Sequence, residues 1–235
     1  MKTSSIFVAI VLCWPVHADD KKQVQGAQIF NATCSQCHGM KGEGNEQFRA
    51  PAIGGMAAWA VERQIDGFRK GHRGVDPKEP VALVMAATVK ALPAEQIKNV
   101  AAAIEKLPIH SHKASTWQQS ADLDYGKMLF EERCMECHRY NGTGEIVFGS
   151  PPLVGRQDWY LLAQLEKFVD GRRGALASDQ FGQKMVNVTR IFESEKAMKD
   201  VVAYISTLRP PEVIAANPLP HSGANPFEEV TAKKP

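Results

Sequence analysis

The final segment of each half of the chain carries apolar residues at helical spacing. In the first half these residues are Ile97, Val100, Ala101, Ile104 and Leu107. In the second half they are Met198, Val201, Val202, Ile205 and Leu208. Both sets follow i, i+3, i+4, i+7 and i+10, the periodicity of one face of an amphipathic helix. We therefore expect a half-buried helix at the end of each half.

Other segments also favour helices over strands. A first helix is expected at about 23–33 and again at 124–133, and a second from Trp59 to Phe68 and from Trp159 to Phe168. Pro93 is well placed as a first-turn residue of the final helix in the first half. Alternating apolar and polar runs, which indicate strands, are scarce. The pattern predicts an all-α fold.

The two halves match at a constant offset of one hundred residues. The matched pairs include Gly26/Gly126, Phe30/Phe130, Gly42/Gly142, Gly44/Gly144, Phe48/Phe148, Pro51/Pro151, Trp59/Trp159, Gln64/Gln164, Phe68/Phe168, Arg73/Arg173 and Met85/Met185. A single insertion then shifts the register of the final helix by one residue. This self-similarity indicates a tandem duplication and therefore two domains.

Composition divides the chain into five regions. Residues 1–18 are expected to be a signal peptide, 19–109 an N-terminal domain, 110–121 a linker, 122–209 a C-terminal domain and 210–235 a proline-rich tail. The linker is polar and lacks a period, and its two histidines, His110 and His112, are expected to be solvated. The tail has no helical pattern, which leaves open whether it is disordered or lies on the surface.

The first eighteen residues have the parts of a secretory signal. Lys2 lies in a short basic region, Ile6 to Leu12 form an apolar run, and Val16 to Ala18 provide a small-residue cleavage site. The apolar run is far shorter than the 18 or more residues that a membrane span needs. We expect export to the periplasm, with no transmembrane segment in the mature chain.

Each half also carries the pentapeptide C-x-x-C-H, from Cys34 to His38 and from Cys134 to His138. Two thiols one helical turn apart can bond one edge of a porphyrin, and the adjacent histidine can bind its iron, which makes this motif the attachment signal for c-type haem. A four-thiolate zinc site would leave both histidines unexplained, and a thioredoxin-like pair needs a βαβ context. We predict two covalent haem c groups, attached through Cys34, Cys37, Cys134 and Cys137, with His38 and His138 as iron ligands.

The cysteine count agrees with this prediction. The chain has five cysteines, and one of them, Cys13, lies within the expected signal peptide. Attachment of two haems uses the other four. No thiol then remains for a disulfide, a metal site or a nucleophile, which argues against cysteine-based catalysis.

The second axial ligand decides whether an iron is closed or open to small molecules. Among the eight methionines, only Met85 and Met185 occur at matched positions, each 47 residues after its histidine. We expect these two to bind the irons. His72 is an alternative in the N-terminal domain only, because Arg172 stands at the matched position. Histidine–methionine ligation at both irons favours electron transfer and argues against catalysis.

Three further repeated pairs have a functional and a structural interpretation. Arg73 and Arg173 suit haem propionates, although solvated arginine is the simpler reading. Trp59 and Trp159 contact the haem edge or fill the core. Pro51 and Pro151 lie 13 residues after their histidines, where a nearby carbonyl can accept from the imidazole and orient it, unless they only shape a turn.

These motifs resemble the dihaem cytochrome c4 family, which is built from tandem class I-type cytochrome c domains. The resemblance covers about residues 25–208 and includes the Gln-x-x-x-Phe-x-x-Gly-x-Arg stretch from Gln64 to Arg73. It implies two domains packed about a pseudo-twofold axis with the haems near the interface. It also implies a periplasmic carrier that passes single electrons between a respiratory complex or dehydrogenase and a terminal oxidase. Arg139, where glycine is usual, and the tail depart from the family pattern.

Charge excludes one class of partner and leaves three functions open. The formal net charge is +2, and no basic stripe with interleaved aromatic residues indicates nucleic-acid binding.

The main hypothesis is a freely diffusing electron carrier. The alternatives are an electron-transfer subunit of a periplasmic dehydrogenase, for example of the flavocytochrome c type, and a haem enzyme with an open iron. Methionine at both irons argues against the enzyme.

Overall fold

The computed structural model describes residues 18–209, so the expected signal peptide and the proline-rich tail lie almost wholly outside it. The helices of the first half are α1 (Ala18–Ile29), a π-helical turn η1 (Phe30–Cys34), α2 (Ser35–His38), α3 (Ala58–Arg69), α4 (Pro80–Lys90) and α5 (Ala94–Glu105). A 3₁₀ turn η2 (Thr116–Ser120) leads into the second half, with α6 (Leu123–Arg133), α7 (Met135–His138), α8 (Asp158–Val169), α9 (Gln180–Thr189) and α10 (Glu195–Thr207). Over residues 18–209 the only strand pairings are two isolated bridges, so the all-α prediction is confirmed.

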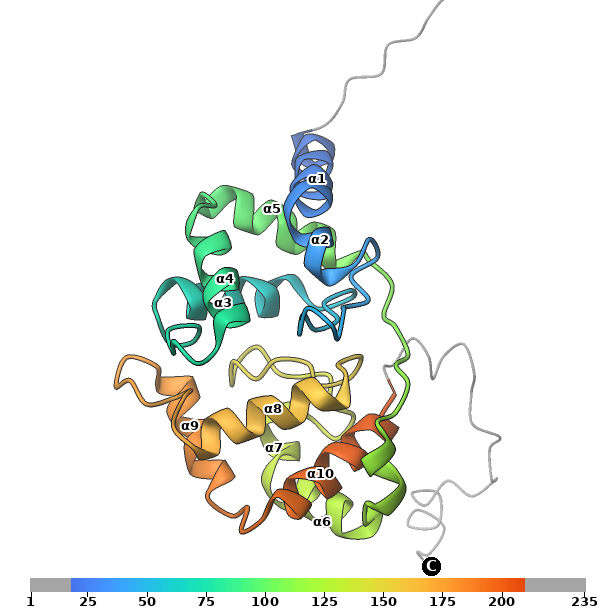
Figure 1. Cartoon of the computed structure of the whole chain (residues 1–235). Coiled ribbons are helices and arrows are strands. Elements are labelled where there is room, and N and C mark those ends of the chain that lie inside the picture. The colour runs from blue at the N-terminus through green and yellow to red at the C-terminus, as the bar shows by residue number, and fades with distance from the viewer. Residues whose placement is uncertain (1–17, 210–235) are drawn as a thin grey trace, which may run out of the picture.

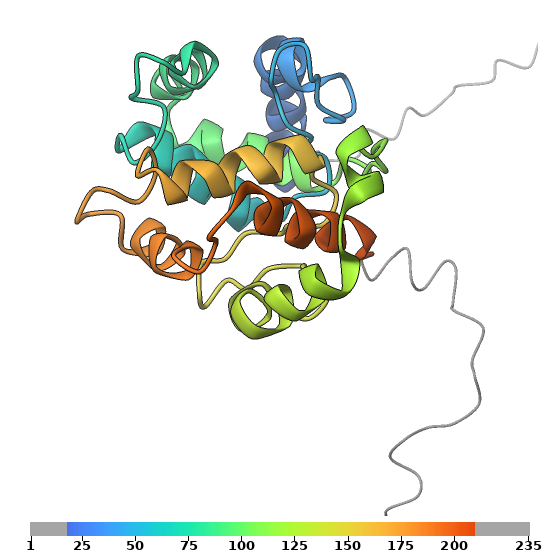
Figure 2. The same ribbon diagram turned by 60° about the horizontal axis from the view of Figure 1, so that its bottom comes forward.

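Each half is built on a crossing of its first and last helices. Helix α1 packs on α5, and α6 packs on α10 (Figures 1 and 2). The crossing explains the repeated Gly26 and Gly126: a Cβ on Gly26 would overlap the backbone oxygen of Asn99, and one on Gly126 would overlap that of Asp200. Glycine is therefore required by the close approach of two backbones.

Two separate apolar cores confirm that the chain forms two domains. The first core includes Phe30, Val100 and Ile104, and the second includes Phe130, Val201 and Ile205. The apolar stripe of each final helix supplies much of its core. Because each core gathers residues of one half only, the duplication seen in the sequence corresponds to two structural units.

Several element boundaries differ from the sequence prediction. The first helix begins at Ala18 and its last turn, η1, is π-helical. Pro93 caps α5 from outside the first turn, because its φ of −60° and ψ of 151° are extended. Helices α4 and α9 were not predicted at all. They are important because α4 carries Met85 and α9 carries Met185.

The linker is more ordered than its composition suggests. The carboxylate of Asp158, which is 4% exposed, accepts hydrogen bonds from the backbone and hydroxyl of Ser115 and from Gln118. A ring nitrogen of His112 lies 3.1 Å from the carbonyl oxygen of Gly155. His110 similarly lies 3.1 Å from the carbonyl oxygen of Lys41. The expectation of a solvated histidine is therefore wrong for His112, which packs on the second domain, whereas the contact of His110 lies at an exposed site.

Among the helices at residues 18–209, none is both long enough and apolar enough to cross a lipid bilayer.

Candidate cofactor-binding sites

Both pentapeptides take the same local structure. Helices α2 and α7 each end on the histidine of the motif, and the following residue turns the chain back. That residue has φ 81° and ψ 154° at Gly39, and φ 66° and ψ 156° at Arg139. This region of φ and ψ belongs almost wholly to glycine, so the sequence departure at Arg139 stores backbone strain. An ion pair between Arg139 and Glu145 accompanies it.

The two motif histidines are buried and oriented in the same way. The Nδ1 atom of His38 lies 2.7 Å from the carbonyl oxygen of Pro51, and that of His138 lies 2.9 Å from Pro151. A carbonyl can only accept, so Nδ1 carries the proton and Nε2 keeps a free lone pair. Burial also lowers the pKa of His138 to about 4 and lowers that of His38, which keeps both imidazoles neutral. Each histidine is thus prepared to bind a metal through Nε2.

The motif cysteines are not arranged for thiolate chemistry. Burial, aided by the neighbouring thiol, raises the pKa of Cys34 to about 11 and that of Cys134 to about 12. Within residues 18–209 no group of three or more His, Cys, Asp or Glu side chains could hold a metal ion. Burial thus disfavours the thiolate form of Cys34 and Cys134, the form that a zinc site or a reactive dithiol would use.

The second domain brings three predicted residues around one cavity. Cys134, His138 and Met185 line a space of about 290 Å³ together with the apolar side chains of Phe168 and Val201. The residues come from α7, α9 and their neighbours, which lie far apart in the sequence. In the first domain, Cys34 and Met85 both pack against the same apolar core. The cavity has the mixed apolar and ligand-bearing lining that a porphyrin requires.

His72 is not placed as a rival ligand. Its Nε2 lies 3.2 Å from the hydroxyl of Ser178, and its Nδ1 lies 3.7 Å from a carboxylate oxygen of Asp179. Both partners belong to the second domain. Each ring nitrogen is therefore engaged across the domain boundary.

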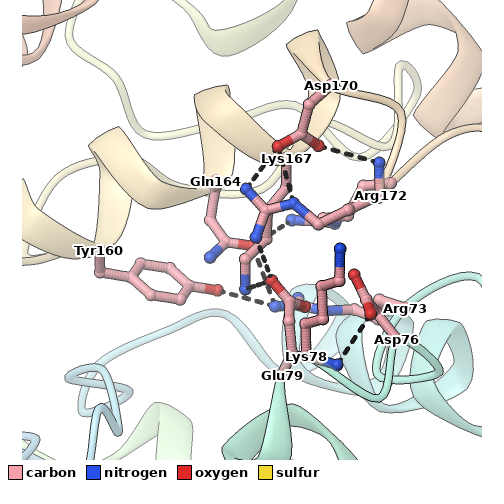
Figure 3. A network of polar contacts seen from close by, with 10 residues as sticks. Arg73, Asp76, Lys78, Glu79, Tyr160, Gln164, Lys167, Asp170 and Arg172 are labelled. Carbon is pink, nitrogen blue, oxygen red and sulfur yellow. Dashed lines mark hydrogen bonds and ion pairs between the residues drawn. The ribbon is translucent and has the colours of Figure 1, made fainter.

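The repeated glutamine and arginine pairs meet between the domains. Figure 3 shows Arg73 beside Gln164 and Tyr160 of the other domain. The amide oxygen of Gln164 accepts from Arg73 at 3.1 Å and from Arg173 at 2.7 Å. Arg73 also donates to Gln64 at 2.6 Å and to the hydroxyl of Tyr160 at 3.3 Å. The sequence alone did not indicate that the guanidinium groups would have these partners.

One of these arginines lacks a partner for a buried donor. The Nε atom of Arg173 is the one buried side-chain nitrogen or oxygen in the described part of the chain without a hydrogen bond. Burial, and secondarily the charge of Arg73, lower the pKa of Arg173 to about 9. A guanidinium beside the cavity whose buried Nε has no partner matches the carboxylates of a porphyrin. The residues of this site therefore fit a haem group.

Glu79 of the first domain adds ion pairs across the same boundary (Figure 3). Its carboxylate lies 2.8 Å from the ammonium group of Lys167 and 2.8 Å from the guanidinium group of Arg172. Both partners belong to the second domain, so this triad ties the two domains together next to the arginine cluster.

The two matched tryptophans occupy different environments. Trp59 packs against the first apolar core, whereas the guanidinium of Arg49, from the other domain, lies 5.0 Å from the ring centroid of Trp159. Trp159 also meets the ring of Tyr160 edge-on, with the centroids 6.0 Å apart. The predicted haem-edge contact of both tryptophans stays a prediction.

Sequence reasoning missed two buried polar residues at the start of α8. Arg156 and Gln157 are 6% and 8% exposed, yet their polar atoms bond the first domain. The signal for them was present in the repeat, because Met56 and Ala57 stand at the matched positions. A change from apolar to polar at a buried position indicates a partner outside the domain.

Comparisons with known proteins give a consistent result. The cytochrome c family model matches residues 23–108 and again 123–209. A thiosulfate dehydrogenase electron acceptor from Stutzerimonas stutzeri is 28% identical over 184 residues, which cover 74% of this chain and 82% of that protein. The structure of reduced cytochrome c4 from Pseudomonas stutzeri superposes with a TM-score of 0.63 at 23% identity, over 80% of this chain and 98% of that one. The thiosulfate dehydrogenase TsdBA from Marichromatium purpuratum has the same TM-score at 26% identity, over 80% of this chain and 40% of that one.

Proposed function

We infer the function from the premise that the chain belongs to the cytochrome c family and contains two of its domains in tandem. It is a dihaem electron-transfer protein with two covalently bound haem c groups. Each haem iron, when bound, supplies a one-electron couple whose potential depends on its axial ligands and surroundings. The roles of particular residues, the partner and the compartment are our proposals.

We propose that Cys34 and Cys37 attach one haem, and that Cys134 and Cys137 attach the other. His38 and His138 would hold the irons on one side, and Met85 and Met185 on the other. The convergence of Cys134, His138 and Met185 on one cavity is the observation that carries this assignment. It is supported in the first domain by the buried, Nδ1-bonded His38 and by the common core of Cys34 and Met85.

Closed coordination at both irons supports electron transfer without substrate chemistry. A thioether on the distal face leaves no position for a small molecule and raises the reduction potential. Met185 lines its cavity together with apolar side chains such as Phe168 and Val201. We therefore propose that the protein is not itself an enzyme.

For the partner, we propose a dehydrogenase that oxidises a reduced sulfur compound as the electron donor. The support is the name of the relative from Stutzerimonas stutzeri, a thiosulfate dehydrogenase electron acceptor. The acceptor would be a terminal oxidase or another respiratory complex. The structural likeness to TsdBA favours one alternative, a chain that stays bound to its dehydrogenase as a subunit. In either case we propose a periplasmic location, which follows from covalent haem and the expected signal peptide.

Spectroelectrochemistry of the full-length holoprotein tests the ligand assignment. Met85→Ala and Met185→Ala should each open one iron, lower one of two potentials and allow one equivalent of carbon monoxide to bind. Met40→Ala is the matched control, because Met40 is 65% exposed and has no methionine partner in the repeat. If both variants keep two closed irons with wild-type potentials, the assignment is wrong and an open-site enzyme becomes the better hypothesis.

A second measurement separates the carrier from the subunit. Periplasmic extract from the native host should yield the protein alone on gel filtration if it diffuses freely. Co-elution with a dehydrogenase that reduces it in the presence of thiosulfate would support the subunit alternative. If thiosulfate reduces the protein neither in the extract nor with a purified thiosulfate dehydrogenase, the proposed donor is wrong.

A further inference from the structure

The C-terminal domain inserts a buried cation into the N-terminal domain. The guanidinium of Arg156 donates to the carbonyl oxygen of Ala52, and also to that of Gly54 at 3.1 Å. Its Nε donates to Val154 within its own domain at 3.4 Å. All of these acceptors are neutral, and no ion pair among the described residues includes Arg156. Burial lowers the pKa of Arg156 to about 10, which still leaves it charged at neutral pH.

Gln157, the next residue, bonds the same loop through both ends of its amide. Its oxygen accepts from the backbone N–H of Ala52 at 2.7 Å, and its nitrogen donates to the carbonyl oxygen of Glu43 at 3.0 Å. The residues that it joins lie more than one hundred positions away in the sequence. The loop after Pro51 is therefore held in place by the other domain.

His38 and Gln157 both bond the peptide unit that joins Pro51 to Ala52. Its carbonyl oxygen accepts from Nδ1 of His38 at 2.7 Å, while its N–H donates to Gln157 at 2.7 Å. Hydrogen bonds in such a chain polarise one another, so each strengthens the next. A stronger bond at Nδ1 makes the imidazole a better electron donor through Nε2.

The second domain cannot have the same arrangement. Pro152 stands where the first domain has Ala52, and proline has no N–H to donate. Met56 and Ala57 occupy the positions matched to Arg156 and Gln157, so the first domain has no polar pair to return. The bond from His138 to Pro151 therefore ends at that carbonyl. Both histidines bond a proline carbonyl, but only the peptide behind His38 is bonded in turn by a residue of the other domain.

The charge and the hydrogen-bond chain act in opposite directions on an iron held by His38. A buried cation nearby disfavours the additional positive charge of the oxidised iron, and so raises the reduction potential. The chain through Gln157 increases donation from the imidazole, favours the oxidised iron and lowers the potential.

We propose that the C-terminal domain tunes the reduction potential of the N-terminal haem, with the charge of Arg156 raising it and Gln157 lowering it through the Pro51–Ala52 peptide, and that no matched pair of residues acts on the peptide behind His138. Gln157 is a positioning residue, because it acts through the peptide that orients His38, whereas Arg156 acts through its charge. The proposal deepens the proposed function and rests on it, since it requires His38 to be an iron ligand. It makes the two haems unequal even if all four axial ligands are equivalent.

The test replaces each residue by its counterpart in the repeat. Arg156→Met and Gln157→Ala are made in the full-length holoprotein, and both potentials are followed by redox titration with NMR of the haem methyl groups, assigned to each domain by their contacts. Arg156→Met should lower the N-terminal potential, by about tenfold in the one-electron equilibrium constant or about 59 mV. Gln157→Ala should raise it by a smaller factor and remove hydrogen-exchange protection from the Ala52 N–H. Gln157→Ala should leave the C-terminal potential unchanged, whereas Arg156→Met is read at the N-terminal haem, because Arg156 also lines the cavity beside His138 and Met185.

Two further variants control for docking and folding. Arg172→Met removes a cation and a contact with Glu79 across the same domain boundary, and it should not produce the selective shift. If Arg156→Met does not accumulate, Arg156→Gln keeps N–H donors for the two carbonyls but removes the charge, and it should still lower the N-terminal potential. A merely structural role would shift both variants in the same direction.

The outcomes distinguish failure of this proposal from failure of the proposed function. N-terminal shifts of the same sign in the two variants, a C-terminal shift in Gln157→Ala, or unchanged potentials in an otherwise normal dihaem protein would overturn the proposal alone. A wild-type protein whose N-terminal iron lacks histidine ligation would remove the proposed function as well. Opposite shifts of the N-terminal potential in the two variants would establish control by the other domain.

Discussion

The N-terminal and C-terminal domains share one sequence plan but differ in how their sites are supported. Both have a buried histidine bonded to a proline carbonyl, and both end in a helix with the same apolar stripe. The loop beyond Pro51 is then held by Arg156 and Gln157 of the other domain, whereas the loop beyond Pro151 has no equivalent. Duplication preserved the groups that we propose bind the cofactor, and divergence changed the groups behind them.

At the interface between the domains, even repeated residues that are identical in both halves have different neighbours. Gln64, Gln164, Arg73 and Arg173 meet there, yet Tyr160 is matched by Ala60, so only one side of the network has a phenol. Arg73 is satisfied by its partners, while Nε of Arg173 is not. A symmetric set of residues thus forms an asymmetric interface because its neighbours differ.

The largest expected loss of stability concerns the helix crossing that both domains share. Gly26→Val and Gly126→Val would each force a side chain into the backbone of the facing helix, at Asn99 or Asp200. Each should destabilise its own domain by about 3 kcal/mol or more, because neither backbone can move away without losing the core. Urea unfolding followed by haem absorbance measures this. Unequal losses would show that the two helix crossings are not equivalent.

A smaller effect should be confined to the C-terminal domain. Asp158 accepts from Ser115, Gln118 and the backbone N–H of Trp159, whereas the matched position in the first domain is Ala58. Asp158→Ala would leave buried donors without acceptors and should cost about 2–3 kcal/mol.

Differential unfolding of the two domains, monitored by their separate haem methyl signals, provides the measurement. Ser120→Ala is the control, because its hydroxyl bonds only the nearby carbonyl of Trp117 at an exposed site. If Asp158→Ala destabilises the N-terminal domain as strongly, then the linker supports both domains equally.

A gain in stability is expected at the turn where the domains differ most. Arg139 adopts the conformation that Gly39 adopts in the first domain. Arg139→Gly should stabilise the C-terminal domain by about 1 kcal/mol, since it relieves strain in a region of φ and ψ that glycine enters freely. The surface ion pair with Glu145 that would be lost contributes little. A thermal midpoint that falls would mean that this ion pair outweighs the strain.

The smallest effect concerns acid sensitivity of the linker. Burial lowers the pKa of His112 below its ordinary value of 6.5. The unfolded chain therefore binds this proton more readily, and the stabilisation is complete above pH 6.5 and lost progressively as the pH falls below it. His112→Gln should reduce the loss of stability between pH 7.5 and pH 5.5. Identical pH profiles for the variant and the wild type in urea unfolding would contradict this.

Part of the architecture could be predicted because its signals are local. The final helices show an unbroken stripe, and the α3 and α8 segments were placed to within a residue or so of their bounds. Helix α4 was missed because Val81, Leu83 and Val84 leave apolar residues exposed on its surface, so the run has no single stripe. Helix α9 was missed because Gly182 and β-branched residues reduce its helix propensity.

The sequence by itself determined the number of domains, the two attachment motifs and the repeated methionines, because a covalent motif and a helical period are properties of neighbouring residues. Only the tertiary structure decided that Gln157 reaches the peptide behind His38 and that Gln164 joins two arginines. The contacts of Gln157 with Ala52 and of Gln164 with Arg73 link residues about one hundred positions apart, and their geometry depends on how two finished domains dock. No local pattern encodes that docking, because neither a helical period nor a motif spacing says which surfaces of the two domains meet.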